Sequence, residues 1–361
     1  MKKYKIWFFV LLGILLFSRL SLALANYIVD PFNVFDSNVL KISSRAQNVR
    51  AVKIRHLSKA HKNYNSYMFG SSRVGTIHPD ALNKYIPGAK FYNFWVSDGN
   101  MLEHVLHLRY FLKQGYEVRN TFVLVDLDIF VTSTDPEQGD YVTKLAPDVS
   151  GMPPLKFYMD YLSVIPYENI RKKLALNYYG IDRYTIDFEK TGLRLKSYED
   201  KLIEQDQLKY IRQVSNLNIN RADRTVSPGT EALDNTLEAL RTLVSICSEN
   251  GINLIVATMP HNYNKLNQLD TESVMHYPRE ISKIIDFWNF STYNRITLDN
   301  RYYYEWSHFR PIVGEMMMAR MFDDDTIEGP SDFGFHVNSS NVESHIKEIS
   351  RGFRAADERY R

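Results

Sequence analysis

Ser66-Tyr67-Met68-Phe69-Gly70-Ser71-Ser72-Arg73-Val74 joins a short apolar run to a glycine turn that carries two serines. We predict a strand over 66–69 that ends in this turn, because short apolar runs bounded by turn residues are typical of buried strands. Similar runs occupy 90–94, 121–127 and 252–257, and segments with helical periodicity separate them. Such alternation is typical of a parallel sheet covered by helices on both faces. The predicted fold class is therefore α/β.

Four chemically notable residues directly follow these predicted strands: Ser72, Gly99, Asp128 and His261. In open parallel sheets, ligands bind beyond the carboxyl ends of the strands. We therefore expect the four residues to lie at one edge of the sheet and to form one site there.

A second segment, Tyr304-Glu305-Trp306-Ser307-His308-Phe309, lies more than 230 positions after the first. Serine needs a base to become a nucleophile, and the imidazole of a base needs an acceptor that fixes its tautomer. Glu305 and His308 are spaced so that one loop or one helical turn can hold both. If the two segments meet in space, the sequence predicts an enzyme that cleaves esters or transfers acyl groups.

These motifs resemble those of the SGNH/GDSL hydrolase superfamily, in particular its membrane-anchored, polysaccharide-modifying branches. The resemblance covers roughly 60–130 and 235–325, and it assigns the nucleophile to Ser72 rather than Ser71 by family position. It implies a three-layer α/β/α, flavodoxin-like parallel sheet. By the same resemblance, His308 is the base, Glu305 orients it, and the backbone N–H groups of Ser72 and Gly99 bind the oxyanion.

The sequence departs from the family pattern in two places. The third block of the family carries an asparagine that completes the oxyanion hole, whereas the corresponding run 122–130 contains none, and an ionised aspartate cannot donate a hydrogen bond. Asn100 is a candidate replacement. Glu305 stands where the family has aspartate. Glutamate serves as the third member of some triads, so this departure is chemically tolerable. The missing asparagine keeps an alternative open, namely a non-catalytic SGNH-like scaffold or glycan-binding subunit of a polysaccharide export or modification complex.

Three further residues are candidates for substrate binding: Arg73, Asp128 and His261. Arg73 can meet an anionic substrate or pair with Asp98. Asp126 and Asp128 are two residues apart, so a regular strand would place both on one face. Asp128 can orient a group of the site or cap the following loop.

Several kinds of ligand are not indicated. His56, His61 and His78 lack metal-ligand spacing, and there is no glycine-rich phosphate loop, so we predict neither a metal nor a cofactor. A formal net charge of +2 gives no footprint for nucleic acid. The single cysteine, Cys247, excludes an intramolecular disulfide.

Residues 1–29 are predicted to be a membrane anchor or signal segment. Three lysines precede the apolar stretch Ile6–Ala25, which is about the length of a bilayer span. Ala23-Leu24-Ala25 resembles a cleavage site, so secretion after signal cleavage is the alternative to a retained single-pass anchor. In either case the lysines stay cytoplasmic, and the main domain is expected to be extracytoplasmic, in the periplasm or at the cell surface.

We expect residues 30–361 to form one SGNH-like α/β domain. A largely helical insertion at about 131–228 interrupts the strand–helix alternation, and a C-terminal extension begins at about 324 with a charged, solvated helix near 342–355. The insertion can bind an acceptor glycan, dock a membrane partner or serve as structural elaboration.

The resemblance also implies a substrate. It points to acetyl groups on an exported polysaccharide, with a membrane-bound O-acyltransferase as a possible acyl donor. Hydrolysis and transfer use the same triad, so the sequence does not choose between them.

Overall fold

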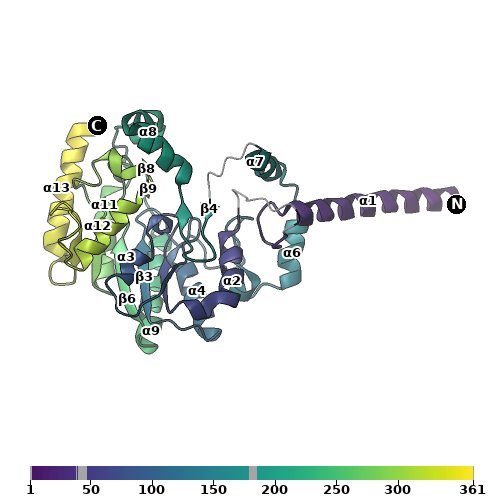
Figure 1. Ribbon diagram of the computed structural model, residues 1–361, viewed down its shortest axis with the longest axis horizontal. Coiled ribbons are helices and arrows are strands. Elements are labelled where there is room, and N and C mark those ends of the chain that lie inside the picture. The colour runs from purple at the N-terminus through teal and green to yellow at the C-terminus, as the bar shows by residue number, and fades with distance from the viewer. Residues whose placement is uncertain (1, 38, 40–46, 179–184, 361) are drawn as a thin grey trace. The chain divides into compact units, whose positions relative to one another are not determined.

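The computed structural model describes residues 2–37, 39, 47–178 and 185–360 (Figure 1). The chain divides into two compact units, one of Met1–Arg55 with Pro136–Thr185 and one of His56–Asp135 with Ile186–Arg361. The segment 131–228, expected to be one insertion, is therefore shared between the two units. The candidate site lies wholly in the second unit.

A six-stranded, mostly parallel sheet forms the centre of the second unit, as expected for an α/β protein. The strand order is β10-β7-β6-β3-β1-β2, and only β10 is antiparallel, against β7. Without β10, the parallel strands follow the order 2-1-3-4-5 of one common doubly wound sheet. The strands are β1 Ser66–Phe69, β2 Phe91–Asn93, β3 Asn120–Val125, β6 Asn253–Thr258, β7 Phe287–Asn289 and β10 Phe335–Val337.

The central position of β3 follows from its sequence. All of its residues, Asn120–Val125, are buried, which suits a strand that has neighbours on both edges and helices on both faces. In register, Phe122 lies beside Met68 of β1 and Ile255 of β6.

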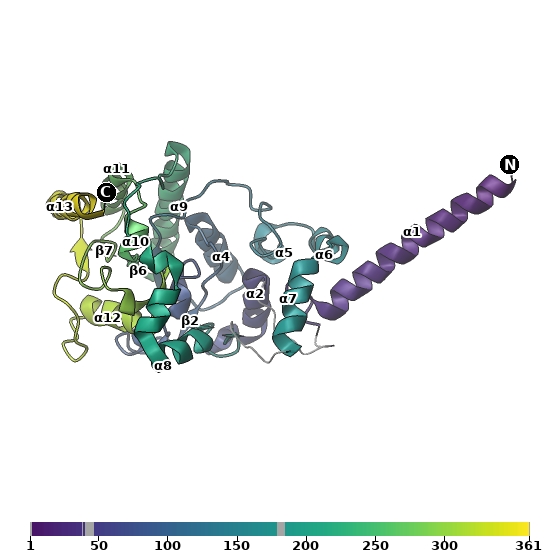
Figure 2. The same ribbon diagram turned by 90° about the horizontal axis from the view of Figure 1, so that it is seen from above.

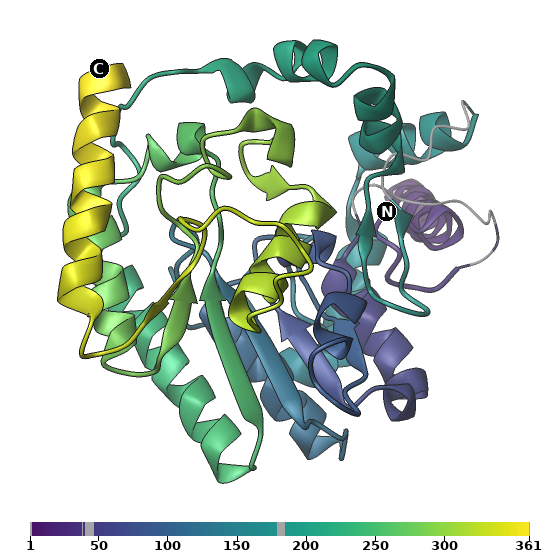
Figure 3. The same ribbon diagram turned by 60° about the vertical axis from the view of Figure 1, so that its left-hand side comes forward.

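Helices cover both faces of the sheet (Figure 3). One face carries α3 (Asp80–Asn83) and α12 (Pro311–Met321), which contact each other. The other carries α4 (Met101–Lys113), α9 (Thr230–Glu249) and α11 (Thr271–Ser282), with α9 in contact with α4 and α11. The placement of α3 opposite α4, α9 and α11 is the one that right-handed crossovers impose on the parallel strands in this order.

The C-terminal segment differs from the expected solvated extension. Its strand β10 completes the sheet, and α13 (Val342–Tyr360) packs on α11. Ile346, Ile349 and Phe353 are buried. Their spacing of three and four residues gives one apolar stripe, which the charged residues between them conceal in the sequence.

The remaining short elements of the second unit lie around the sheet. They include β5 (Arg194–Leu195) and α8 (Ser197–Gln213) from the predicted insertion, and the hairpin of β8 (Tyr303–Glu305) and β9 (His308–Phe309). The others are α10 Tyr263–Leu266, η1 His61–Asn63, η2 Val74–Thr76, η3 Ser215–Asn218 and η4 Asn300–Tyr302; β4 Thr185–Ile186 lies at the boundary of the units.

The first unit is helical. Its elements are α1 Lys2–Val29, α5 Pro147–Ser150, α6 Pro154–Ser163, α7 Tyr167–Tyr178 and most of α2 Val49–Ala60. Its core gathers Phe32, Ala51, Phe157 and Tyr161. Figure 2 shows α1 as one long helix, and its stretch Lys3–Val29 is long and apolar enough to cross a membrane. Most of the side chains in this stretch are exposed.

Candidate active site

The turn after β1 presents Ser72 at the carboxyl edge of the sheet. Gly70 begins the turn, and a Cβ there would lie 3.1 Å from both the Leu124 carbonyl oxygen and the Val74 side chain, so the approach favours glycine. The Val74 N–H donates to the Ser71 carbonyl at 3.2 Å and closes the turn. Ser72 Oγ lies 2.8 Å from His308 Nε2, although 236 positions separate the two residues.

The Glu-x-x-His segment forms a tight β-hairpin. Glu305 ends β8 and pairs directly with His308 at the start of β9, which places both side chains on one face. Glu305 Oε1 contacts His308 Nδ1, and Glu305 Oε2 accepts the Ser307 N–H at 2.9 Å. The Glu305 carboxylate favours the tautomer of the neutral imidazole that carries its proton on Nδ1. Nε2 is then unprotonated and can accept the proton of the serine hydroxyl.

A helix from the predicted insertion supports this hairpin. The Tyr304 hydroxyl donates to Asp200 of α8 at 2.6 Å, and the Tyr210 hydroxyl of α8 donates to the Tyr304 carbonyl at 2.8 Å. These bonds fix the strand that carries Glu305.

The protonation states of the pair suit a general base. Burial is the largest influence on His308 and lowers its pKa to about 4; Glu305 opposes this shift and the nearby Arg194 adds to it. Burial alone would raise the pKa of Glu305, but the hydrogen bond and charge of His308 outweigh it, and the pKa is about 2. At neutral pH, His308 is thus neutral beside an ionised carboxylate.

The three predicted oxyanion donors differ in the hydrogen bonds that they already make. In the described part of the chain, no group accepts a hydrogen bond from the Ser72 N–H, which leaves it available. The Gly99 N–H donates to the Val96 carbonyl at a long 3.3 Å, so an oxyanion would have to displace that bond. The Asn100 side-chain oxygen caps α4 by accepting the Glu103 N–H at 3.1 Å. The oxyanion roles of all three residues stay predictions.

Arg194 of β5 is a site residue that the sequence did not reveal. Its Nη1 lies 2.9 Å from His308 Nε2, the same nitrogen that faces Ser72. Its guanidinium lies over the Trp95 ring, 5.7 Å from the centroid. The residues just before Arg194 are bonded to the end of β2 and the turn after it, because the Asn93 N–H donates to the Thr191 carbonyl at 2.9 Å and Trp95 Nε1 donates to the Gly192 carbonyl at 2.8 Å. The segment that carries Arg194 is thereby held beside the nucleophile turn.

Arg73 lies in a buried ionic network and does not pair with Asp98. Its Nη1 donates to Asp126 at 2.5 Å, and its Nη2 donates to Asp128 at 2.8 Å. His261 Nε2 lies 3.2 Å from Asp128. Arg73 and His261 are buried, and the Asp128 carboxylate bonds to both of them. Substrate contact by Arg73, Asp128 and His261 stays a prediction.

The same network explains a cluster that resembles a metal site. One ligand atom each of Asp126, Asp128 and His261 lie within 4.8 Å of one another. Arg73 Nη1 contacts all three side chains, so its positive charge already occupies the place that a cation would take. Burial would lower the pKa of Arg73, but the two carboxylates outweigh it and raise the pKa.

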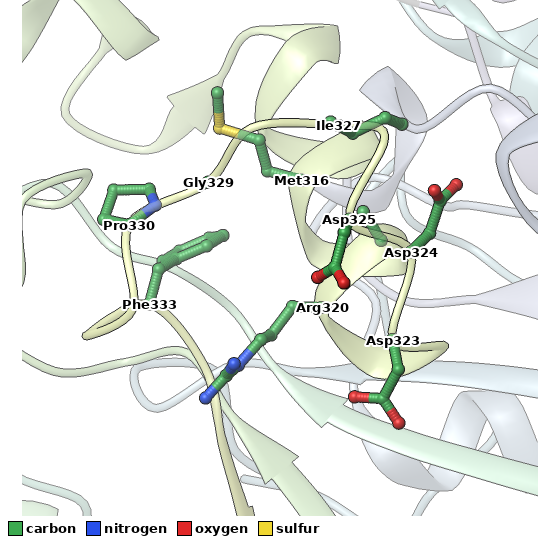
Figure 4. A pocket seen from close by; sticks show the side chains of 10 residues that line it. Met316, Arg320, Asp323, Asp324, Asp325, Ile327, Gly329, Pro330 and Phe333 are labelled. Atoms are coloured by element: carbon green, nitrogen blue, oxygen red, sulfur yellow. The ribbon is translucent and has the colours of Figure 1, made fainter.

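A separate pocket lies between α12 and the segment that follows it (Figure 4). It is lined by Met316, Arg320, Asp323, Asp324, Asp325 and Phe333, among others. Asp324 contacts Lys84 and accepts a hydrogen bond from the Tyr85 hydroxyl at 2.6 Å, so this carboxylate links the segment after α12 to the segment after α3.

Comparisons with protein families, with curated proteins and with solved structures each found no match.

Proposed function

We propose that this chain is a serine esterase or O-acyltransferase that acts on acyl esters, in particular acetyl esters, of an exported cell-surface polysaccharide. The observation that carries the proposal is the continuous relay from Ser72 Oγ to His308 Nε2, at 2.8 Å, and from His308 Nδ1 to Glu305. The long apolar helix α1 supports a single-pass anchor in the cytoplasmic membrane with the catalytic unit outside it.

The first half-reaction forms an acyl-enzyme. His308 Nε2 takes the proton of Ser72 Oγ as that oxygen attacks the ester carbonyl, and the carbonyl π electrons move onto the oxygen. Glu305 stabilises the resulting imidazolium. His308 then gives the proton to the departing alcohol oxygen as the carbon–oxygen bond of the substrate breaks.

The second half-reaction reverses these steps with a new nucleophile. If water attacks the acyl-enzyme, the products are a carboxylic acid and free Ser72, and the enzyme is an esterase. If a sugar hydroxyl attacks, the acyl group is transferred to the glycan. A membrane-bound O-acyltransferase would be the source of acyl groups in the second case.

Arg194 supplies the donor that the third block lacks. Its guanidinium lies beside the two groups that change charge, and it is a permanent cation. When His308 becomes an imidazolium, the two cations repel each other, and the oxyanion that forms near them offsets that repulsion. Arg194 therefore favours the charge distribution of the transition state over that of the ground state.

Replacement of Arg194 by methionine is expected to lower kcat/KM for a generic acetyl ester about 10²-fold, since loss of one oxyanion donor has effects of that order. It should also move the acid limb of the pH profile upward. The limb reports protonation of His308, whose pKa of about 4 is partly depressed by Arg194, so removal of the arginine raises that pKa. Rates measured between about pH 3 and pH 8 test both effects.

Arg194→Lys is the matched control, because it keeps the positive charge. It should retain more of the activity than Arg194→Met, and the acid limb of its pH profile should stay where it is in the wild type. An unchanged rate and an unshifted limb in Arg194→Met would contradict a role for this residue in catalysis.

Replacement of Glu305 by glutamine is expected to reduce turnover by about 10³- to 10⁴-fold, because an amide can orient His308 in the wrong tautomer and cannot stabilise the imidazolium. Glu305→Asp tests the importance of reach and should be intermediate. Equal activity of all three proteins would argue against the relay.

Trapping of the acyl group tests the proposal itself and its two branches. The full-length protein in detergent, treated with p-nitrophenyl acetate and quenched rapidly, should carry acetate on the peptide that contains Ser72. Acetyl-free oligosaccharides are then added. If they take up the acetyl group from Ser72, the enzyme is an O-acyltransferase; if the rate of hydrolysis is unchanged, it is an esterase. If a well-folded protein never acquires acetate, the non-catalytic scaffold or glycan-binding subunit becomes the better account.

A further inference from the structure

One face of α6 in the first unit is apolar and exposed. Leu155 and Met159 are 76% and 50% exposed, and Tyr158 is also exposed. At about 100° per residue, these three side chains fall within one arc of about 100°. Phe157 and Tyr161 point into the core of the unit instead.

Two more large apolar side chains are exposed shortly after the end of α6. Ile165 and Tyr167 are 77% and 68% exposed. The five side chains Leu155, Tyr158, Met159, Ile165 and Tyr167 are called the α6 face below. On the helix, Lys156 and Asp160 lie between this face and the core-facing side chains, and each forms an ion pair, with Glu137 and Lys144 respectively.

The depth of the α6 face follows from α1. The stretch Ile6–Ala25 has the twenty residues that span about 30 Å of hydrocarbon at 1.5 Å per residue. Asn26 is the next residue, and it is fully buried. Its Nδ2 donates to the carbonyl oxygens of Leu162 and Val164, at 3.0 and 2.7 Å. The end of α6 is thus bonded to the point at which α1 would leave the membrane.

Further bonds fix the chain at this level. Lys173 Nζ of α7 donates to the Asp30 carbonyl at 2.6 Å and to Asn33 Oδ1 at 3.0 Å. The Asp30 carboxylate accepts the N–H groups of Val34 and Phe35. Figure 1 shows α6 beside the inner end of α1.

We propose that the α6 face lies in the lipid interface of the outer leaflet, so that the first unit is held on the membrane by a surface element as well as by α1. This inference rests on the proposed single-pass anchor. Apolar side chains at this depth lose their contact with water, and tyrosine is enriched where the hydrocarbon meets the headgroups. The ion-paired side of α6 is directed to the aqueous phase.

The chain offers a clean labelling background for the test. Cys247 is its only cysteine and is buried, and burial raises the pKa of its thiol to about 12. Leu155→Cys and Ile165→Cys of the full-length protein would carry a bimane probe in vesicles of phosphatidylethanolamine and phosphatidylglycerol. Lys156→Cys is the matched control on the same turn of α6, and Leu15→Cys reports whether α1 spans the bilayer.

Doxyl-labelled lipid should quench the probes at 155 and 165 about threefold more than the probe at 156, and iodide in the water should show the reverse order, as expected for an interfacial helix. If the probe at 15 is quenched by lipid while 155 and 165 behave like 156, the inference is overturned although the anchor stands. Protection of 155 and 165 from both quenchers would assign the face to a protein surface and overturn it as well. If the probe at 15 is not quenched, the anchor itself fails, and the inference fails with it.

Discussion

Ser72→Ala and His308→Ala are each expected to lower ester turnover by about 10⁶-fold, the scale seen when either member of a serine–histidine pair is removed. The reason is that neither group acts alone: the serine proton has no other acceptor in the relay, and the imidazole has no other nucleophile to activate. The double variant should be no slower than either single one. Initial rates with p-nitrophenyl acetate measure all three.

Ser71→Ala is the matched control for the nucleophile. Ser71 is buried, and its Oγ accepts the Arg73 N–H at 3.4 Å, so it shapes the turn without facing His308. It should retain most of the activity. If Ser71→Ala were inactive and Ser72→Ala active, the assignment of the nucleophile would be wrong.

Arg73→Met should lower the free energy of unfolding by about 3 to 5 kcal/mol, the range for removal of one side of a buried ion pair. The substitution removes the guanidinium from both carboxylates; Asp128 keeps Lys265 and His261, whereas Asp126 loses the arginine with which it forms an ion pair. Burial alone would raise the pKa of Asp128, but Arg73 and His261 outweigh it and hold the pKa well below its usual range. Urea unfolding of wild type and variant measures the loss.

The sign of the pH dependence follows from that shift. A carboxyl group with a lowered pKa in the folded state stabilises the protein above its unfolded pKa of about 4, and this stability is lost as the pH falls through the folded value. The wild type should therefore lose stability on acidification. In Arg73→Met the pKa of Asp128 is held down less strongly, so this pH-dependent contribution to stability should become smaller.

Two controls separate the network from a general effect of losing arginine. Arg119→Met removes an exposed arginine paired with Glu117, and it should change stability little. Addition of Asp126→Asn to Arg73→Met should recover part of the loss, because it removes the buried carboxylate whose ion pair with Arg73 has been lost. Equal destabilisation by Arg73→Met and Arg119→Met would contradict the account of the network.

The α/β class could be predicted from sequence because it depends on strong local signals, whereas the expectation that Ser72 meets His308 and Glu305 comes from the resemblance of their motifs to those of the SGNH/GDSL hydrolases. Apolar runs mark buried strands, and residues that follow parallel strands share an edge of the sheet. The hairpin was not foreseen, but the three-residue spacing of Glu305 and His308 suits a two-residue turn as well as a helical one.

The partner of Arg73 depended on strand order, which the local sequence does not encode. Asp98 is near in sequence after β2, whereas Asp126 and Asp128 follow β3. Both β2 and β3 flank β1, so the sequence alone allows Arg73 a carboxylate partner on either side. The buried pair of carboxylates after β3 provides the larger compensating charge.

Arg194 was missed for a related reason. It lies in a segment without apolar periodicity, 114 positions before His308, and its contact depends on the bonds that tie that segment to the end of β2.

Strands β7 and β10 have three residues each, too few to show an alternation. Their place in the sheet depends on long-range pairing.

The most direct test of the central claim is the reaction of the full-length protein in detergent with a fluorophosphonate probe, followed by mass spectrometry of the modified peptide. An activated serine next to a neutral imidazole predicts an adduct on Ser72 that disappears in Ser72→Ala and His308→Ala. A well-folded wild type that acquires no adduct, or an adduct on another residue that persists in both variants, would contradict the claim that Ser72, His308 and Glu305 form a catalytic relay.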